Sequence, residues 1–244
     1  MVVLGCALGA CRDFAPPSDT VNLPIADRPW AEGAPPEGWC GEASLQMAAL
    51  HFGVWVPQAE ANRLGAPKTP DLWEHDLPTA LTALGFDFER GPTKHLDALS
   101  GWTVKQLRAG HPVILGLKFV ETRHPAWDVD HLVLVTGFTP DGLRLATNQH
   151  EGEVRAGWKA LASPEGVRGY TLRNASGTTW AFAVKGSRHG GGVRAEVLGE
   201  SAQMVRLKLT PERAATLLRD DLPLDAGTVE LEVPATKVTR FGLR

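Results

Sequence analysis

The chain has 244 residues, of which 43% are hydrophobic and 22% are charged. This composition is typical of a soluble globular protein that is long enough for one substantial core. The net charge of -3 and the pI near 6.2 give no electrostatic attraction for nucleic acid, and no basic run carries interleaved aromatic residues. We therefore expect no nucleic-acid partner.

The first eleven residues form a short apolar segment that is rich in small side chains. It is too short to span a bilayer and precedes a polar stretch over residues 12–27, which is typical of the end of a secretory signal. Leu8-Gly9-Ala10-Cys11 resembles the bacterial lipobox, in which the cysteine becomes the lipidated N-terminus, and Cys6 is a second candidate. We expect a cell-envelope location, periplasmic or extracellular, with membrane attachment through a lipid on Cys11. The alternative is an unstructured apolar tail.

Helical patterns dominate the first half of the chain, after an expected linker over residues 12–34. Prolines and a glycine over residues 35–38 resist helix, strong helix formers follow, and Gly53 is placed to end the run. The apolar residues of this first helix lie on nearly every side, which predicts a helix buried in the middle of a domain. We expect helices over Cys40–Phe52, Pro57–Leu64, Asp76–Leu84 and Thr103–Ala109, and a short strand over Phe86–Glu89.

From residue 112 the pattern changes to alternating or continuous apolar residues, which indicates a sheet. The residues of Thr139–Gly142 are those of a tight turn, so the strands on either side of it should form an antiparallel hairpin. We expect strands over Pro112–Phe119, Asp130–Phe138, Leu143–Asn148, Gly169–Leu172 and Thr178–Val184, a short helix over Gly157–Ser163, and Trp180 in the core.

A flexible Gly-rich linker is expected over residues 187–192. The C-terminal unit after it has about fifty residues, is marginal alone and should dock on the main domain. Its patterns predict strands over residues 193–198, 204–209 and 229–233 and a helix over Pro211–Leu218. The expected domain organisation is a signal or lipobox remnant over 1–11, a linker over 12–34, a main domain over 35–186, the Gly-rich linker, and a small β-rich unit over 193–244.

Cys40 stands at the expected start of the buried helix. Unpaired backbone N–H groups and the positive end of the helix dipole can stabilise a thiolate there and lower the pKa of the cysteine. A thiolate is a nucleophile, whereas a thiol is not. The alternative is structural, because free cysteine is among the most buried residue types.

A cysteine nucleophile needs a base and a third group that orients the base. The predicted hairpin supplies both, with His131 at the opening of one strand and Asn148 at the far end of its partner. A turn over residues 139–142 places positions near 131 opposite positions 149 and 150, so we expect the two side chains to be neighbours.

Two alternatives for this chemistry remain. His150 is a rival base because it follows Asn148 closely. His124, Asp128 and His131 could form a metal site, but the chain has no His-Glu-x-x-His or paired-cysteine spacing. We expect neither a metal nor a cofactor.

Three short motifs, in this order along the chain, carry a family resemblance: Trp39–Met47, Pro112–Ile114 and Asp130–Phe138. They resemble the papain-like cysteine peptidases, most closely the bacterial branch that removes double-glycine leaders from exported peptides, and its secreted relatives. The resemblance covers roughly residues 35–185. It implies an α+β fold in which a helical N-terminal half with a central cysteine-bearing helix packs on an antiparallel sheet, with a small C-terminal α/β appendage.

The resemblance also implies a peptide or protein substrate that is hydrolysed through an acyl-enzyme. Cys40 would be the nucleophile, His131 the general base and acid, and Asn148 the orienting residue. The family usually has a glutamine five or six residues before the cysteine, where its amide helps to bind the developing oxyanion. Ala34 and Pro35 stand at those places, and no glutamine precedes Cys40.

The missing glutamine motivates a second hypothesis, a peptide-binding module that keeps the fold with weak catalysis or none. A third is cell-wall amide hydrolysis of the NlpC type, although those enzymes usually show Asp-Cys-Ser where this chain has Trp39-Cys40-Gly41. The sequence leaves the oligomeric state open.

The lipobox resemblance predicts that cells expressing the chain incorporate a fatty-acid analogue at Cys11. Replacing Cys11 with alanine should abolish the label because the acceptor sulfur is lost, whereas Cys40→Ala should leave it unchanged. Gel fluorescence after metabolic labelling measures both. Label that persists in Cys11→Ala would contradict the assignment to this residue.

Overall fold

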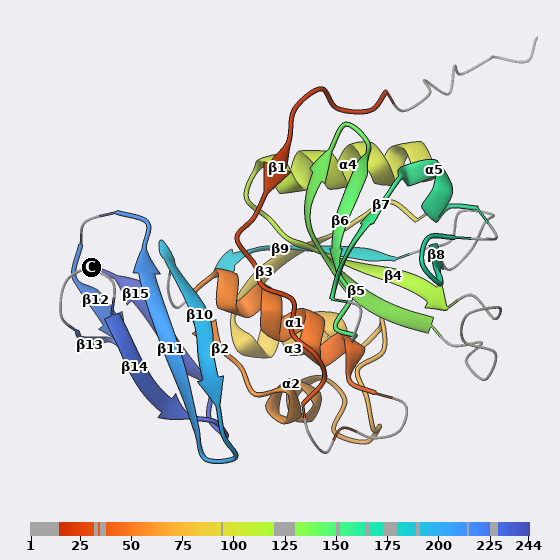
Figure 1. Ribbon diagram of the computed structural model, residues 1–244. Helices are drawn as coiled ribbons and strands as arrows, with labels where there is room; N and C mark the ends of the chain where they lie inside the picture. Colours follow the sequence, from red (N-terminus) through yellow and green to blue (C-terminus); the bar gives the residue numbers. More distant parts are fainter. Residues whose placement is uncertain are drawn as a thin grey trace, which may run out of the picture.

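Helices and antiparallel strands form two lobes, so the fold class is α+β (Figure 1). The structure is a computed structural model that describes residues 15–31, 34, 38–93, 95–119, 130–149, 152–163, 166–172, 180–188, 191–213, 215–224 and 229–244. The main lobe extends to Ser187, and the C-terminal lobe begins at Val193. Cys6 and Cys11 lie outside the described residues. In the described part of the chain no helix is long and apolar enough to cross a membrane.

An eight-stranded antiparallel sheet with the order β3-β9-β4-β5-β6-β7 organises the main lobe, with β1 added to β5 and β8 to β4. Pairing of Thr139 with Gly142 and of Leu134 with Ala146 confirms the predicted β5–β6 hairpin. The strands are β1 (Val21–Asn22), β3 (Phe86–Arg90), β4 (Val113–Phe119), β5 (Asp130–Thr139), β6 (Gly142–Ala146), β7 (Glu153–Ala156), β8 (Tyr170–Leu172) and β9 (Ala181–Ser187).

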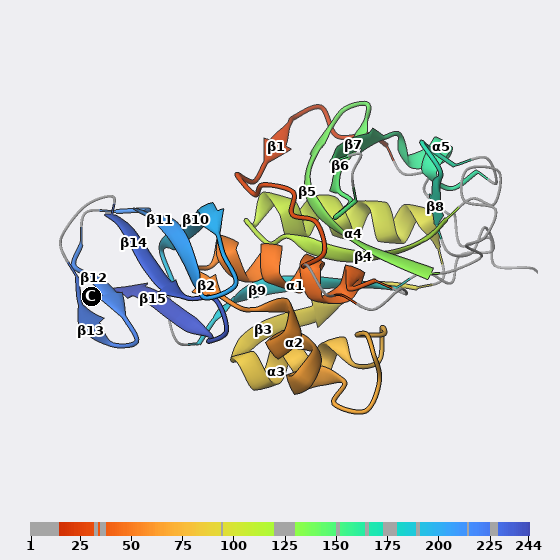
Figure 2. The same ribbon diagram turned by 60° about the horizontal axis from the view of Figure 1, so that its bottom comes forward.

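Helices cover both faces of this sheet (Figure 2). Successive residues of a strand point to opposite faces, so Ile114 packs in the core with α1 while Val113 and Leu115 pack in the core with α4. The helices are α1 (Cys40–His51), α2 (Gln58–Gly65), α3 (Leu77–Leu84), α4 (Leu96–Arg108) and the short α5 (Trp158–Leu161).

The central helix α1 is buried on all sides, which confirms the prediction from its apolar residues. Every residue from Cys40 to Leu50 is buried. The helix ends where Gly53 adopts a φ of 69°, a conformation that favours glycine. Cys40, the candidate nucleophile, therefore lies at one end of a helix whose position is fixed by packing along its whole length.

Helix α4 begins seven residues before the predicted Thr103. Gly101 interrupts the helix-forming sequence and costs about 1 kcal/mol relative to alanine. Burial of Leu99, Val104 and Leu107 against the sheet outweighs this local preference.

The described residues of the C-terminal lobe contain strands and no helix, so the expected α/β appendage was wrong. Leu217 and Leu218 lie in β12 and pair with β15, in place of the predicted helix over Pro211–Leu218. Leu217 is fully buried beside Phe241, and this pairing outweighs helix propensity. The strands are β10 (Val193–Glu200), β11 (Met204–Pro211), β12 (Leu217–Arg219), β13 (Leu222–Pro223), β14 (Val229–Pro234) and β15 (Thr239–Leu243).

The apolar core of the C-terminal lobe is shared with the end of α1 and with the strand that follows it. Strand β2 (Val54–Trp55), which follows α1 in the chain, pairs with β15 and forms one edge of the four-stranded sheet β13-β12-β15-β2; the other sheet of the C-terminal lobe has the order β10-β11-β14. Leu50 at the end of α1 and Trp55 are buried among the apolar side chains of that lobe. The C-terminal lobe is thus built onto the end of α1 (Figure 1).

The segment over residues 15–31, part of the expected linker, packs along the main lobe. Its strand β1 pairs with β5 through Val21 and Phe138. Farther along, the Arg28 guanidinium donates to Gln46 of α1 at 3.0 Å and forms a 2.6 Å ion pair with Glu200 of β10. The segment is a strap that crosses α1 and reaches the C-terminal lobe.

The shared core predicts that Phe241→Ala destabilises the chain by about 3–5 kcal/mol, because it leaves a cavity in a packed interior. Leu222→Ala in the same sheet should change the free energy of unfolding by less than about 0.5 kcal/mol, because Leu222 is 70% exposed. Urea unfolding followed by tryptophan fluorescence measures both. A separate early transition of the C-terminal lobe in Phe241→Ala, with the main lobe unaffected, would show that the lobes do not share a core.

Candidate active site

Cys40 occupies the first turn of α1, where the helix is pressed between β5 and a loop. The Ser44 hydroxyl donates to the Leu132 carbonyl oxygen of β5 at 3.3 Å. On another side, a Cβ added at Gly41 would lie 2.8 Å from the Leu72 carbonyl oxygen, so only glycine fits against this loop. The Cys40 residue is 9% exposed.

His131 is the second residue of β5 and is 1% exposed. Its ring stacks on Tyr170, with ring centroids 5.6 Å apart. Its Nε2 lies 2.9 Å from the Thr147 carbonyl oxygen. Because a carbonyl oxygen only accepts, Nε2 carries the hydrogen and Nδ1 keeps the lone pair. The structure thereby selects the tautomer whose basic nitrogen is Nδ1.

The side-chain amide of Asn148 joins α1 to β5. Its Nδ2 donates to the Leu132 carbonyl oxygen at 2.8 Å, and lies 3.2 Å from the Ser44 hydroxyl and 3.4 Å from the Cys40 carbonyl oxygen. Asn148 is 1% exposed and has a φ of 52°, a conformation in which asparagine is enriched. This residue therefore fixes the turn that carries Cys40 against the strand that carries His131.

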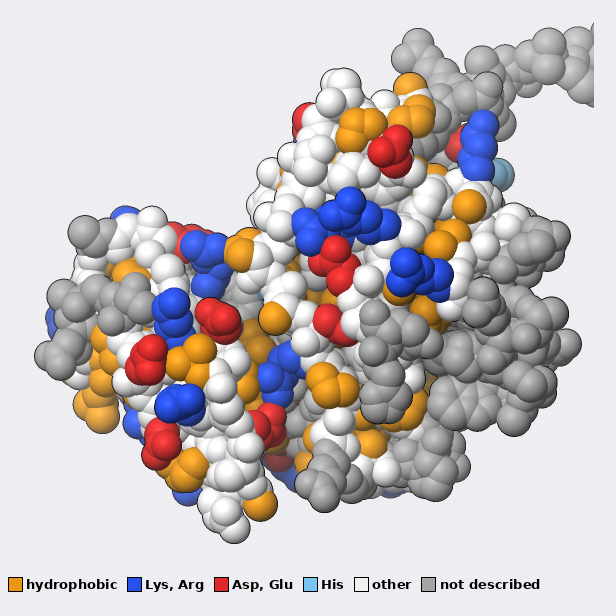
Figure 3. All heavy atoms as spheres, viewed as in Figure 1, with side chains coloured by type: hydrophobic (Ala, Val, Ile, Leu, Met, Phe, Trp, Pro, Cys, Tyr) orange, Lys and Arg blue, Asp and Glu red, His pale blue; other side chains and the backbone are white. Residues whose placement is uncertain are grey.

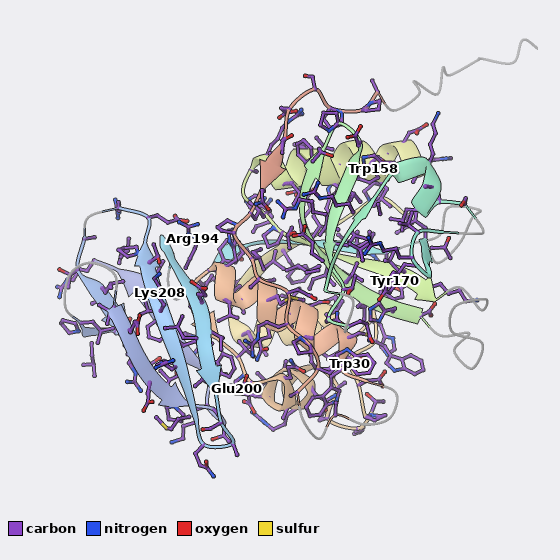
Figure 4. All side chains as sticks on the ribbon, in the orientation of Figure 1. Trp30, Trp158, Tyr170, Arg194, Glu200 and Lys208 are labelled. Carbon is purple, nitrogen blue, oxygen red and sulfur yellow. The ribbon has the colours of Figure 1, made fainter. Side chains whose placement is uncertain are left out.

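Two residues of the strap form hydrogen bonds with Asn148. The Trp30 indole N–H donates to Asn148 Oδ1 at 2.8 Å, and the Asn148 backbone N–H donates to Asp27 Oδ1 at 2.9 Å. A Cβ at Gly38, whose φ is 87°, would lie 2.3 Å from the Trp30 ring. Figure 4 shows Trp30 at the Cys40 end of α1. Trp30 thus covers the backbone just before Cys40.

The structure places the Asn148 amide 3.4 Å from the Cys40 carbonyl oxygen, and His131 precedes Leu132, whose carbonyl oxygen accepts from the same amide. Asn148 lies next to Leu132, and its amide makes no bond to the His131 ring. The Thr147 carbonyl oxygen orients that ring. Sequence reasoning missed this acceptor because a backbone carbonyl leaves no trace in residue identity. It also missed Trp30, whose ten-residue separation from Cys40 follows no motif.

The pKa of the Cys40 thiol is raised to about 12, chiefly by burial and to a smaller extent by the negative charges of Glu42 and Asp71. Backbone hydrogen bonds from Leu132 and Gly41 act in the opposite direction but are weaker. The loss of hydration exceeds the effect of the helix N-terminus, which we expected to lower this pKa. Cys40 is therefore a thiol at neutral pH in this structure.

Glu42 is a buried carboxyl that ties α1 to the loop beside Cys40. Its Oε1 accepts from the Leu72 N–H at 2.8 Å and from Asn62 Nδ2 at 3.0 Å. Its Oε2 is buried and has no hydrogen-bond partner in the described part of the chain. Burial raises the pKa of Glu42 to about 7. Near pH 7 this carboxyl is therefore present in both its protonated and its ionised form.

Among the described residues, no group of three or more His, Cys, Asp and Glu side chains could hold a metal ion. His124 and Asp128, two members of the alternative metal site, lie outside those residues, as do the rival base His150 and Pro35. No family model and no curated protein matches this chain.

One solved structure with a similar chain trace comes from Bacillus anthracis and is described as a C39-like peptidase. It shares 13% sequence identity with this chain and has a TM-score of 0.44. The match covers 70% of this chain and 100% of the other.

The raised pKa of Glu42 makes the stability of the chain depend on pH. Between pH 4.5, the ordinary value, and pH 7, the folded state keeps a proton that the unfolded state has lost, so the free energy of unfolding falls as pH rises. The fall due to Glu42 should be about 3 kcal/mol. In Glu42→Gln it should be absent, because the amide does not titrate.

Urea unfolding of both proteins at pH 4.5, 6 and 8 gives the difference between their free energies of unfolding. Glu60→Gln on α2 is a control that should keep the fall, because that carboxyl is not buried with Glu42. If the free energies of unfolding of the wild-type chain and Glu42→Gln differ by the same amount at all three pH values, Glu42 has an ordinary pKa, which would contradict this prediction.

Proposed function

We propose that the chain is a papain-like thiol peptidase that hydrolyses peptide bonds, with Cys40 as nucleophile and His131 as general base and acid. The observation that carries this proposal is the bond from His131 Nε2 to the Thr147 carbonyl oxygen, which leaves Nδ1 as the basic nitrogen. The Asn148 amide supports the proposal as well, because it bonds the Leu132 carbonyl oxygen, one residue after His131, and lies 3.4 Å from the Cys40 carbonyl oxygen.

Cys40 Sγ attacks the carbonyl carbon of the substrate while its proton passes to His131 Nδ1. With a pKa of about 12 the thiol does not ionise beforehand, so proton transfer accompanies the attack. His131 then gives this proton to the leaving amine, and the acyl group stays on sulfur as a thioester. Water hydrolyses the thioester as its proton passes through His131 back to Sγ.

The developing oxyanion needs hydrogen-bond donors, and no glutamine precedes Cys40. The N–H groups at the start of α1, those of Cys40 and Gly41, have no acceptor within the helix. They are the donors that the helix offers beside the nucleophile. Asn148 is a positioning residue in this proposal because it holds the Cys40 turn by its carbonyl oxygen.

A second candidate function, a peptide-binding module without catalysis, is favoured by the burial of Cys40. The same residues would then form a closed polar core beneath Trp30. Attachment through Cys11 would place either function at the cell envelope.

Cleavage of a peptide library, read by mass spectrometry, tests the peptidase. Cys40→Ala and His131→Ala should each lower the rate at least about 10³-fold, because each removes a reacting group. His95→Ala is a matched control that replaces an exposed histidine and should keep full activity. Cleavage that survives Cys40→Ala would refute a thiol mechanism. Peptides that bind but are not cut by the wild-type chain would favour the binding module.

A further inference from the structure

A cavity of about 660 Å³ lies where the two lobes meet, far from the Cys40 end of α1. It is lined by the ends of α1, α4 and β9 and by the start of β10, which Figure 1 places together. Figure 3 shows the surface hollowed at this junction. A neighbouring cavity of about 480 Å³ shares His51 and Arg194 with it. Leu23 and Pro24 also line both cavities, so His51 and Arg194 are the two shared residues that can carry a charge.

Arg194 stands near the start of β10 on the side of the main lobe (Figure 4). Its Nε is buried and has no hydrogen-bond partner, and its guanidinium forms no ion pair with any residue that the structure describes. A buried N–H donor without an acceptor is costly, and such groups commonly mark the place of a missing water or ion. Arg194 is thus a cation whose Nε–H could donate to an anion that the structure does not contain.

His51, the last residue of α1, offers the complementary group. Its Nε2 donates to the Gly110 carbonyl oxygen at 3.0 Å, so Nδ1 holds the lone pair. Nδ1 is buried, again without a partner among the described residues. Burial lowers the pKa of His51, which keeps the ring neutral near pH 7. The cavity is therefore lined by one unpaired donor residue and one unpaired acceptor residue.

Among the residues that the structure describes, the cavity has three other groups that can carry a charge, Lys185, His111 and Glu212. Lys185 Nζ lies 3.2 Å from Glu89. Burial lowers the pKa of His111, whose Nδ1 lies 2.9 Å from an amide oxygen. Glu212 is exposed and is the single acidic side chain among the described lining residues. Glu212 and Arg194 both act on His51 through their charges, but Arg194 forms no ion pair with any residue that the structure describes.

We propose that this cavity binds hydrogen phosphate, with Arg194 as the main anchor and His51 as the discriminating residue. The phosphate oxygens accept hydrogen bonds from the guanidinium. Its planar arrangement of N–H groups can donate two parallel hydrogen bonds to two phosphate oxygens. The phosphate hydroxyl donates to His51 Nδ1. Sulfate has similar oxygens but no hydroxyl at neutral pH, so it satisfies Arg194 and leaves His51 unpaired.

Such a ligand would bridge the lobes, because Arg194 belongs to the C-terminal lobe and His51 to α1. The C-terminal lobe then has a role as half of a binding site. Cys40 and His51 are the two ends of α1, so the site is distinct from the proposed catalytic residues. This inference does not depend on the peptidase proposal.

Isothermal titration of the full chain with sodium phosphate tests the site, in a phosphate-free buffer at pH 7 with ionic strength held constant by sodium chloride. We expect saturable binding of one phosphate and at least tenfold weaker binding of sulfate. Arg194→Gln should weaken phosphate binding at least tenfold. Arg206→Gln, which neutralises an exposed arginine on β11, is the matched control and should bind as the wild-type chain does.

If Arg194→Gln proves unfolded by circular dichroism, Arg194→Lys keeps the charge but removes the buried Nε–H and should still bind phosphate several-fold more weakly. No saturable heat with phosphate would overturn the proposal. Equal affinity in the wild-type chain and the Arg194 variants would also overturn it and would indicate an adventitious ion only. Equal affinities for phosphate and sulfate would refute the role of His51.

Discussion

The hydrogen bond from the Asn148 amide to the Leu132 carbonyl oxygen is the contact on which the site depends. At 2.8 Å it fixes the end of the β5–β6 hairpin, and the same amide reaches the Cys40 carbonyl oxygen at the start of α1. The Trp30 indole N–H, in the strap, donates to the oxygen of the same side chain. Each of these donors and acceptors is buried or partly buried, so losing one partner would leave the other unsatisfied at a cost of about 1–3 kcal/mol. Segments distant in the sequence are therefore held in one geometry.

The packing that holds this geometry also limits its chemistry. α1 is buried from Cys40 to Leu50, which places its first turn reproducibly, but the same burial raises the pKa of the thiol to about 12. A site that gains reactivity from a helix N-terminus needs that end to be hydrated or paired with a cation. Here Glu42 and Asp71 add negative charge nearby. Packing thus fixes the position of Cys40, but the thiol needs a base to remove its proton.

Local signals in the sequence predicted the elements that position the site. Helix formers between Gly38 and Gly53 indicated α1, and the Thr139–Gly142 turn indicated the hairpin, because both depend on residues close in the chain. The helix expected over Pro211–Leu218 was wrong, since pairing with the distant β15 decides that segment. The acceptor of the His131 ring is a backbone carbonyl, and a carbonyl has no residue type to recognise. The roles of Cys40, His131 and Asn148 in catalysis remain predictions.

The central claim is that burial keeps Cys40 a thiol until a base takes its proton. The rate at which iodoacetamide alkylates Cys40, followed by mass spectrometry from pH 6 to pH 10, tests it most directly. The account predicts that Cys40 reacts far more slowly than a small thiol throughout this range. It also predicts that Asn148→Ala, which releases the first turn of α1, accelerates the reaction. Rapid alkylation of the wild-type chain at pH 6 would contradict the account.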